Sequence, residues 1–137
     1  MKSNKINFFD LSLQYKSIKE EINCEILETL ESSCYVLGEK VKNFEDKFSA
    51  KHNSKFGIAF NSGTSALHLA LLAIGVKEGD EVLIPSMTFI ATAAAVAYIK
   101  AIPVFVDIDL KDLNMNIEEI ESKITIKTKA IIPVHLH

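Results

Sequence analysis

The stretch that decides the fold spans residues 60–75 and reads FNSGTSALHLALLAIG. A strand end, a small polar turn and an apolar helix closed by a glycine follow one another in it. The turn places Gly63, Thr64 and Ser65 in the first turn of the helix. Backbone N–H groups are unpaired there and the helix dipole is positive, so the turn suits an anion, above all a phosphate. An ordinary capped helix is the alternative interpretation.

Residues 56–137 alternate between strand and helix patterns on both sides of this turn. Strands are predicted at 56–60, 81–84, 103–108 and 129–134, and helices at 64–74, 89–99 and 116–124. The strands are nearly unbroken apolar runs, which is typical of a parallel sheet covered by helices on both faces. The helix at 64–74 is apolar almost all round, so we expect it to be buried.

Two further helices, at 13–31 and 39–50, are predicted before this region. The sequence is therefore divided into an N-terminal helical segment, residues 1–55, and an α/β part, residues 56–137. The fold class is α/β, with a parallel-rich sheet flanked by helices.

Composition limits the classes of partner. The net charge of −3 leaves no basic footprint for nucleic acid, and the positive residues are all lysines. Cys24 and Cys34 fit no metal spacing, and neither do the four histidines, so no metal site is predicted. The basic N-terminus leads into no apolar signal core, and the longest apolar run, 90–99, is too short to span a bilayer. These features favour a cytoplasmic protein without a membrane partner.

The turn at Gly63 lacks the lysine of a nucleoside-triphosphate loop and the glycine spacing of a dinucleotide fingerprint, which argues against ATP and NAD. Asp107 and Asp109 are interpreted as turn and capping residues. His135 is interpreted as a packed or solvent-paired histidine. By residue type alone, Phe89 is a core aromatic.

Residues 61–71, NSGTSALHLAL, resemble the pyridoxal-phosphate enzymes of the DegT/DnrJ/StrS type, the sugar aminotransferases. Further segments match this family in the same order: INFFDLSLQY (6–15), YVLG (35–38), GDEVLIP (79–85), TFIAT (88–92), PVFVDID (103–109) and TKAIIPVHL (128–136). The resemblance covers nearly the whole chain. It implies the first part of the large domain of the aspartate aminotransferase-like, fold type I transferases. The rest of that domain and a small C-terminal domain are expected outside this sequence.

The resemblance also implies roles for single residues. Gly63, Thr64 and Ser65 would hold the phosphate of pyridoxal 5′-phosphate through N–H and hydroxyl donors, and Phe89 would lie over the pyridine ring. The lysine that forms a Schiff base with the cofactor, and the aspartate that pairs with the pyridine nitrogen, are expected beyond His137. No catalytic residue is therefore assigned within the chain.

The family implies an enzyme that moves an amino group from an amino acid, usually glutamate, to a nucleotide-linked keto-sugar. Its products feed glycans, surface polysaccharides or natural products, and the full-length enzymes act as homodimers. We expect the present chain, as an N-terminal fragment, to be inactive alone. Two alternatives stay open: a non-catalytic phosphate-ligand-binding module or decayed gene product, and a pyridoxal-phosphate-dependent sugar dehydratase of the same family.

Overall fold

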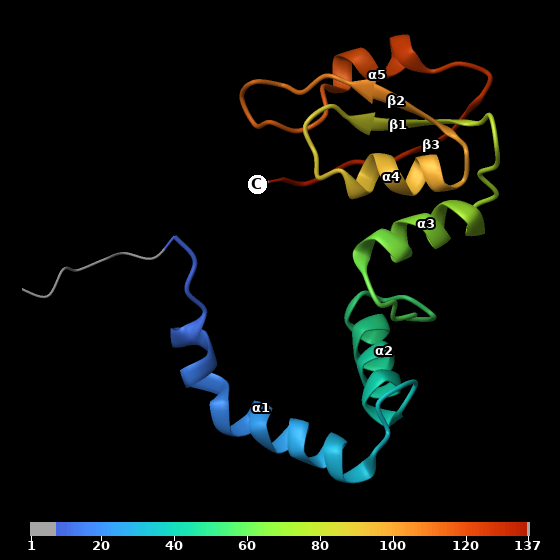
Figure 1. Cartoon of the computed structure of the whole chain (residues 1–137). Coiled ribbons are helices and arrows are strands. Elements are labelled where there is room, and N and C mark those ends of the chain that lie inside the picture. Colours follow the sequence, from blue (N-terminus) through green and yellow to red (C-terminus); the bar gives the residue numbers. More distant parts are fainter. Residues whose placement is uncertain (1–7, 137) are drawn as a thin grey trace, which may run out of the picture. The chain divides into compact units, whose positions relative to one another are not determined.

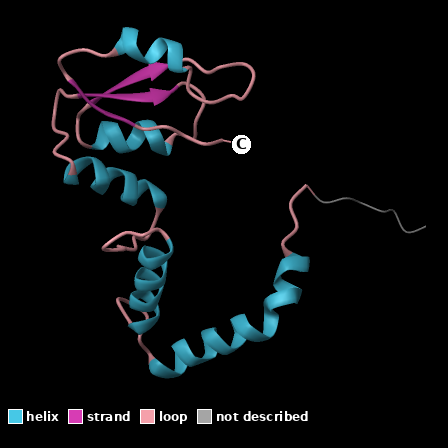
Figure 2. Cartoon of the chain, turned by 180° about the vertical axis from the view of Figure 1, so that it is seen from behind, coloured by secondary structure: helices cyan, strands magenta, loops and turns pink. Residues whose placement is uncertain are grey.

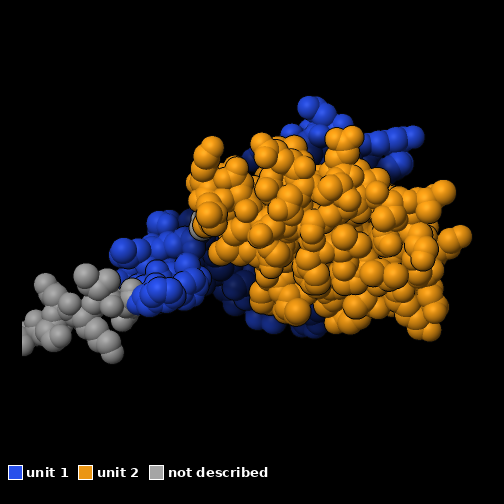
Figure 3. Space-filling model, turned by 90° about the horizontal axis from the view of Figure 1, so that it is seen from above, with its two compact units in different colours: residues 1–58 blue, residues 59–137 orange. Residues whose placement is uncertain are grey.

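A computed structural model describes residues 8–136 and divides the chain into two compact units, Met1–Ile58 and Ala59–His137 (Figure 3). The first unit contains α1 (Ser12–Ser32) and α2 (Glu39–Lys51), each within about one residue of the predicted bounds. The two helices are joined by Lys40 of α2, whose ammonium group is paired with Glu25 and, at 2.9 Å, with Glu28 of α1. No residue of α1 or α2 is buried.

The second unit is built on three parallel strands, β1 (Glu81–Pro85), β2 (Ile102–Val106) and β3 (Thr128–Ile131), in the order β2-β1-β3. The helices are α3 (Gly63–Ala73), α4 (Ala91–Tyr98) and α5 (Ile117–Lys123). Figures 1 and 2 show α4 and α5 on opposite faces of the sheet. The prediction of a parallel sheet with helices on both faces is therefore confirmed.

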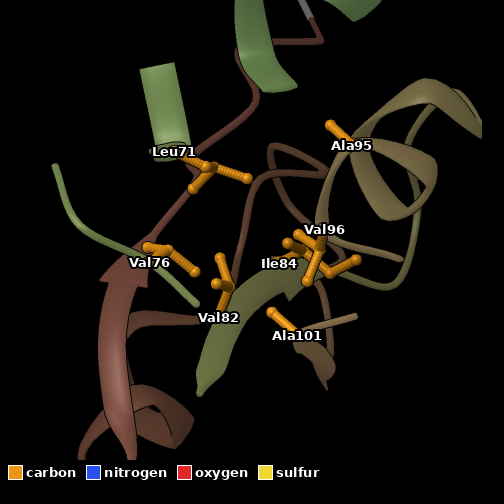
Figure 4. Close-up of a cluster of buried hydrophobic side chains, with 7 residues drawn as sticks. All are labelled: Leu71, Val76, Val82, Ile84, Ala95, Val96 and Ala101. Atoms are coloured by element: carbon orange, nitrogen blue, oxygen red, sulfur yellow. The ribbon is translucent and has the colours of Figure 1, made fainter. Parts of the chain in front are cut away.

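The central strand β1 is buried on both faces, because successive side chains of a strand point in opposite directions. Val82 and Ile84 pack into one cluster with residues from or next to α3, α4 and β2 (Figure 4): Leu71, Val76, Ala95, Val96 and Ala101. Leu83 points to the other face, where it joins Val106, Met115 and, from α5, Ile120. This packing holds α4 against one face of the sheet, with α3 packed on α4, and α5 against the other face.

The end of α3 is fixed by a glycine and by the core together. Gly75, one residue beyond the C-cap, has a φ of +83°. Its N–H donates to the Leu72 carbonyl at 3.0 Å, and the Val76 N–H donates to the Leu71 carbonyl at 3.0 Å. These two bonds form a Schellman motif, and the core contact of Leu71 and Val76 accompanies it. The turn sends the chain into β1.

The prediction of a strand at residues 56–60 is wrong. These residues form neither helix nor strand, and they pair with no strand among the residues that the structure describes. Their alternating apolar side chains lie open to solvent, with Phe56 71%, Ile58 72% and Phe60 42% exposed. A β-strand needs a paired strand as well as a suitable pattern, and the described sheet, ordered β2-β1-β3, does not include this segment.

The expectation that α3 is buried also needs correction. Leu71 is its only buried residue, while Leu69 and Leu72 are 42% and 45% exposed. The helix packs on α4 and on the core cluster with one face, and the described residues of its own unit lay no second layer over the other face. Within residues 8–136, no helix has the length and the apolar character of a membrane span.

Candidate functional site

The carboxyl ends of the three parallel strands define one edge of the second unit. The first turn of α4 lies at this edge because α4 follows β1. The first turn of α3 lies there too, since α3 runs toward the start of β1 (Figures 1 and 2). In open parallel sheets, ligands bind just beyond the carboxyl ends of the strands. The predicted residues of both helix starts are thus at the edge where a ligand is expected.

The first turn of α3 has a defined set of used and unused donors. The N–H of Ser65 donates to the Ser62 hydroxyl at 3.1 Å, which makes Ser62 the N-cap, and the N–H of Ala66 donates to the Ser62 carbonyl at 3.1 Å. The Ser62 hydroxyl donates to the Ser65 hydroxyl at 3.0 Å. For the N–H groups of Gly63 and Thr64, the described residues provide no acceptor. Two backbone donors are therefore available at the positive end of the helix.

The space beside the Gly63 Cα, where a side chain would lie, is open. A Cβ built on Gly63 would meet no atom within 4 Å. The Thr64 hydroxyl, which is without a partner among the described residues, adds a third donor on the same turn. Unpaired N–H groups, a hydroxyl and open space fit the phosphate of pyridoxal phosphate, which needs several donors at once. The first lysine along the second unit is Lys77, beyond the far end of α3, so backbone donors and hydroxyls form this seat.

A short loop, residues 86–90, connects β1 to α4 and is anchored at its start. The N–H of Ser86 donates to the Val106 carbonyl at 2.8 Å, and its hydroxyl donates to Asp107 Oδ1 at 3.3 Å. Both bonds tie the end of β1 to the end of β2. Sequence reasoning missed this link, because Ser86 and Asp107 are 21 residues apart and only the strand register brings them together.

The same loop is anchored again where α4 starts. The hydroxyls of Thr88 and Thr92 are 2.9 Å apart, and the Thr92 N–H donates to the Phe89 carbonyl at 3.1 Å. The helix begins at Ala91 rather than at the predicted residue 89, which leaves Phe89 in the loop. Its side chain is 76% exposed, so the core interpretation of Phe89 is wrong. The sequence signal for this bond is the spacing of Thr88 and Thr92, which are four residues apart and lie on either side of the predicted start of the helix at residue 89.

Asp107 and Asp109 follow β2 and have the turn roles that the sequence predicts. The Asp107 carboxylate accepts the Ile108 N–H at 2.8 Å, and the Asp109 carboxylate accepts the Lys111 N–H at 2.8 Å. The Asp107 N–H donates to Glu119 Oε2 at 3.4 Å. These side-chain bonds replace the strand ladder, so β2 ends at Val106 and not at the predicted residue 108.

Four further residues with titratable side chains lie outside the two helix starts: His135, Asp112, Lys100 and Lys129. His135, beyond the end of β3, is exposed. In the loop after β2, the Asn114 N–H donates to Asp112 Oδ1 at 2.9 Å and holds the pKa of Asp112 below its ordinary value. Lys100 lies two residues before β2 and Lys129 is the second residue of β3, both on the amino side of the sheet.

The fold and the site define an α/β protein with unpaired N–H donors at the start of one helix and an exposed aromatic side chain just before another. Residues 16–137 match the DegT/DnrJ/EryC1/StrS aminotransferase family, and the chain belongs to this family. It is 42% identical over 132 residues to UDP-2-acetamido-2-deoxy-3-oxo-D-glucuronate aminotransferase of Pseudomonas aeruginosa, covering 96% of this chain and 37% of the relative.

Solved structures of the same kind superpose closely on the chain. DesV from S. venezuelae, solved in complex with a ketimine intermediate, matches with a TM-score of 0.92 and 36% identity over 96% of this chain and 36% of its own. NtdA from Bacillus subtilis, with bound cofactor PMP, matches with a TM-score of 0.86 and 33% identity over 99% of this chain and 32% of its own. The chain spans about a third of the length of these relatives. Pyridoxal phosphate is the cofactor that the family and these neighbours indicate.

Proposed function

We propose that this chain forms the cofactor-phosphate end of a pyridoxal-phosphate-dependent aminotransferase that acts on nucleotide-linked keto-sugars. The observation that carries the proposal is the first turn of α3, where the N–H groups of Gly63 and Thr64 have no acceptor among the described residues and a Cβ built on Gly63 would meet no atom within 4 Å. In this site Gly63, Thr64 and Ser65 bind the phosphate, and Phe89 covers one face of the pyridine ring. When bound, the cofactor supplies an electron sink for bond changes at an amino-bearing carbon.

The electrostatics at the first turn of α3 favour binding of a phosphate over binding of a neutral group. Its donors lie at the positive end of an eleven-residue helix, and the nearest residues along the chain carry no acidic side chain. Ser65 shares its hydroxyl with Ser62, so the cap holds the seat in shape without an added ligand. A preformed donor set loses little conformational freedom when an anion binds.

The substrates follow from the family and from the names of the relatives. A UDP-linked keto-sugar is named for the Pseudomonas aeruginosa relative, and we assign the same class of acceptor, with glutamate as the amino donor, to the whole protein. We place this enzyme in the cytoplasm as a homodimer. The lysine that binds the cofactor covalently is assigned to no residue of this chain, because Lys100 and Lys129 lie away from the carboxyl edge. We therefore expect the chain alone to bind the cofactor without turnover.

Pyridoxamine phosphate is the probe that tests this proposal. It has the ring and the phosphate but no aldehyde, so it forms no imine with the fifteen lysines. A phosphorus NMR titration of the chain measures its affinity, with inorganic phosphate and phosphate-free pyridoxamine as competitors. We expect inorganic phosphate to displace it and pyridoxamine to compete far less well.

Thr64→Val is the variant that tests the seat itself. Loss of one hydrogen bond to a charged group is expected to weaken pyridoxamine phosphate binding by about ten-fold. Thr29→Val is the matched control, because the Thr29 hydroxyl bonds only the Glu25 carbonyl within α1, at 2.7 Å. Equal competition by pyridoxamine and phosphate, or an unchanged affinity of the Thr64 variant, would contradict the proposed function.

A further inference from the structure

We propose that Thr92 is a positioning residue for Phe89. Its buried hydroxyl, bonded to Thr88, holds the 86–90 loop so that the exposed Phe89 ring is presented to a planar ligand ring. This inference rests on the proposed function, since it takes Phe89 as the residue that stacks on the cofactor. It assigns a task to a residue that touches neither the phosphate nor the ring.

The first step is the partner of the Thr92 hydroxyl, which lies outside the helix. Hydroxyl side chains within helices normally bond a backbone carbonyl of the same helix. Five others in this chain do so, at 2.7–3.0 Å: Ser17, Thr29, Ser32, Ser49 and Ser122. Thr92 is the second residue of α4, so no carbonyl of its own helix lies three or four residues before it, and its hydroxyl bonds the side chain of Thr88, outside α4. Its hydroxyl therefore holds the loop before the helix.

The second step is burial. Thr92 is 5% exposed and belongs, with Asp80, to the buried polar residues of the described chain. Leaving a buried hydroxyl without a hydrogen-bond partner costs folding free energy, so the bond between Thr92 and Thr88 is expected to persist. Thr88 itself is half-buried and directly precedes Phe89. The buried member of the pair thus fixes the residue next to the exposed aromatic.

The third step is the contrast between a fixed backbone and an exposed side chain. The loop is held at Ser86 by β2 and at Phe89 by the Thr92 N–H. The Phe89 ring is nevertheless 76% exposed and lies outside both core clusters. An aromatic ring on an anchored loop loses little freedom when a second ring stacks on it. The anchoring therefore raises the affinity for a ring and leaves the affinity for a phosphate unchanged.

The experiment compares two ligands on the same chain, pyridoxamine phosphate and inorganic phosphate, each titrated by phosphorus NMR. Thr92→Val removes the hydroxyl and keeps the shape, and we expect it to weaken pyridoxamine phosphate binding roughly five-fold, as the loss of one neutral hydrogen bond predicts. Phosphate binding should be unchanged. Thr92→Ser retains the hydroxyl and should restore the affinity, while Thr29→Val should affect neither ligand. In a Phe89→Ala background, Thr92→Val should have no further effect.

Hydrogen exchange supplies a readout without a ligand: backbone amides of residues 86–92 should exchange faster in Thr92→Val and at the original rate in Thr92→Ser. If Thr92→Val fails to fold, Thr88→Val removes the same bond from its more exposed side. An unchanged pyridoxamine phosphate affinity, or an equal loss for both ligands, overturns the inference, while the proposed function stands as long as the unaltered chain binds both ligands. If the unaltered chain binds neither ligand, the proposed function fails and this inference with it.

Discussion

Substitutions at three glycines of the second unit can show how much stability depends on backbone conformation, because none of them would create a side-chain clash. Gly75 and Gly79 have φ angles of +83° and +84°, whereas Gly63 is not among the residues with positive φ. A Cβ added at any of the three would meet no atom within 4 Å. Replacing each by alanine therefore changes the backbone preference without creating a clash.

The magnitudes follow from this geometry. Gly75→Ala and Gly79→Ala each force an L side chain into the left-handed region, which costs about 1–2 kcal/mol. Gly63 is the first residue of α3, so Gly63→Ala restricts the unfolded chain at no native cost and should stabilise the protein by roughly 0.4–1 kcal/mol. The difference between Gly75→Ala and Gly63→Ala should then be about 1.4–3 kcal/mol. Gly75→Asn should fall between them, because asparagine tolerates this conformation better.

Urea unfolding followed by far-UV circular dichroism measures these differences as shifts of the midpoint at constant slope. Gly75 lies at the opposite end of α3 from the phosphate seat, so the folded Gly75→Ala chain should keep its affinity for pyridoxamine phosphate. Equal midpoints for the Gly63 and Gly75 variants would refute the reasoning. A Gly63→Ala variant less stable than Gly75→Ala would do so as well.

Two further predictions concern the core and the loop after β2. Leu83→Ala removes a fully buried side chain that packs with Val106 and Met115, and should lower the free energy of unfolding in urea by about 2–5 kcal/mol; a smaller loss would show that this face of the sheet is loosely packed. The Asn114 N–H lowers the folded-state pKa of Asp112, so the stability that Asp112 contributes is present at neutral pH and is lost as the pH falls through that lowered pKa. Asp112→Asn should therefore flatten the acid side of the stability curve measured by urea midpoints, and an unchanged curve would contradict this.

Where local chemistry marks both ends of an element, its position could be predicted from the sequence. The helix predicted at 64–74 is α3 (Gly63–Ala73), because the Ser62 cap and Gly75 act on the chain within a few residues of themselves. The strand predicted at 81–84 is β1 (Glu81–Pro85), an apolar run that ends at a proline. The helix predicted at 116–124 is α5 (Ile117–Lys123), and the side chain of its N-cap, Asn116, accepts the Glu118 N–H at 3.0 Å.

Elements that depend on distant partners could not be predicted in the same way. The alternation of Phe56, Ile58 and Phe60 indicates which side of a strand is apolar, but it contains no information about a neighbouring strand. The start of α4 was predicted two residues early because Phe89 and Ile90 continue the apolar pattern. The Thr88–Thr92 bond and the exposure of both apolar residues place them before the helix instead.

The candidate site combines these two kinds of information. The phosphate seat is local, since Ser62, Gly63, Thr64 and Ser65 are adjacent in the chain and one helix start arranges them. The loop that presents Phe89 depends on the register of β1 against β2 and on a buried side chain of α4. Substitutions that disturb the β1–β2 pairing should therefore reduce ring binding before they reduce phosphate binding. Binding of the cofactor ring by Phe89 therefore depends on the folding of the whole α/β unit, whereas binding of the phosphate depends mainly on the start of α3.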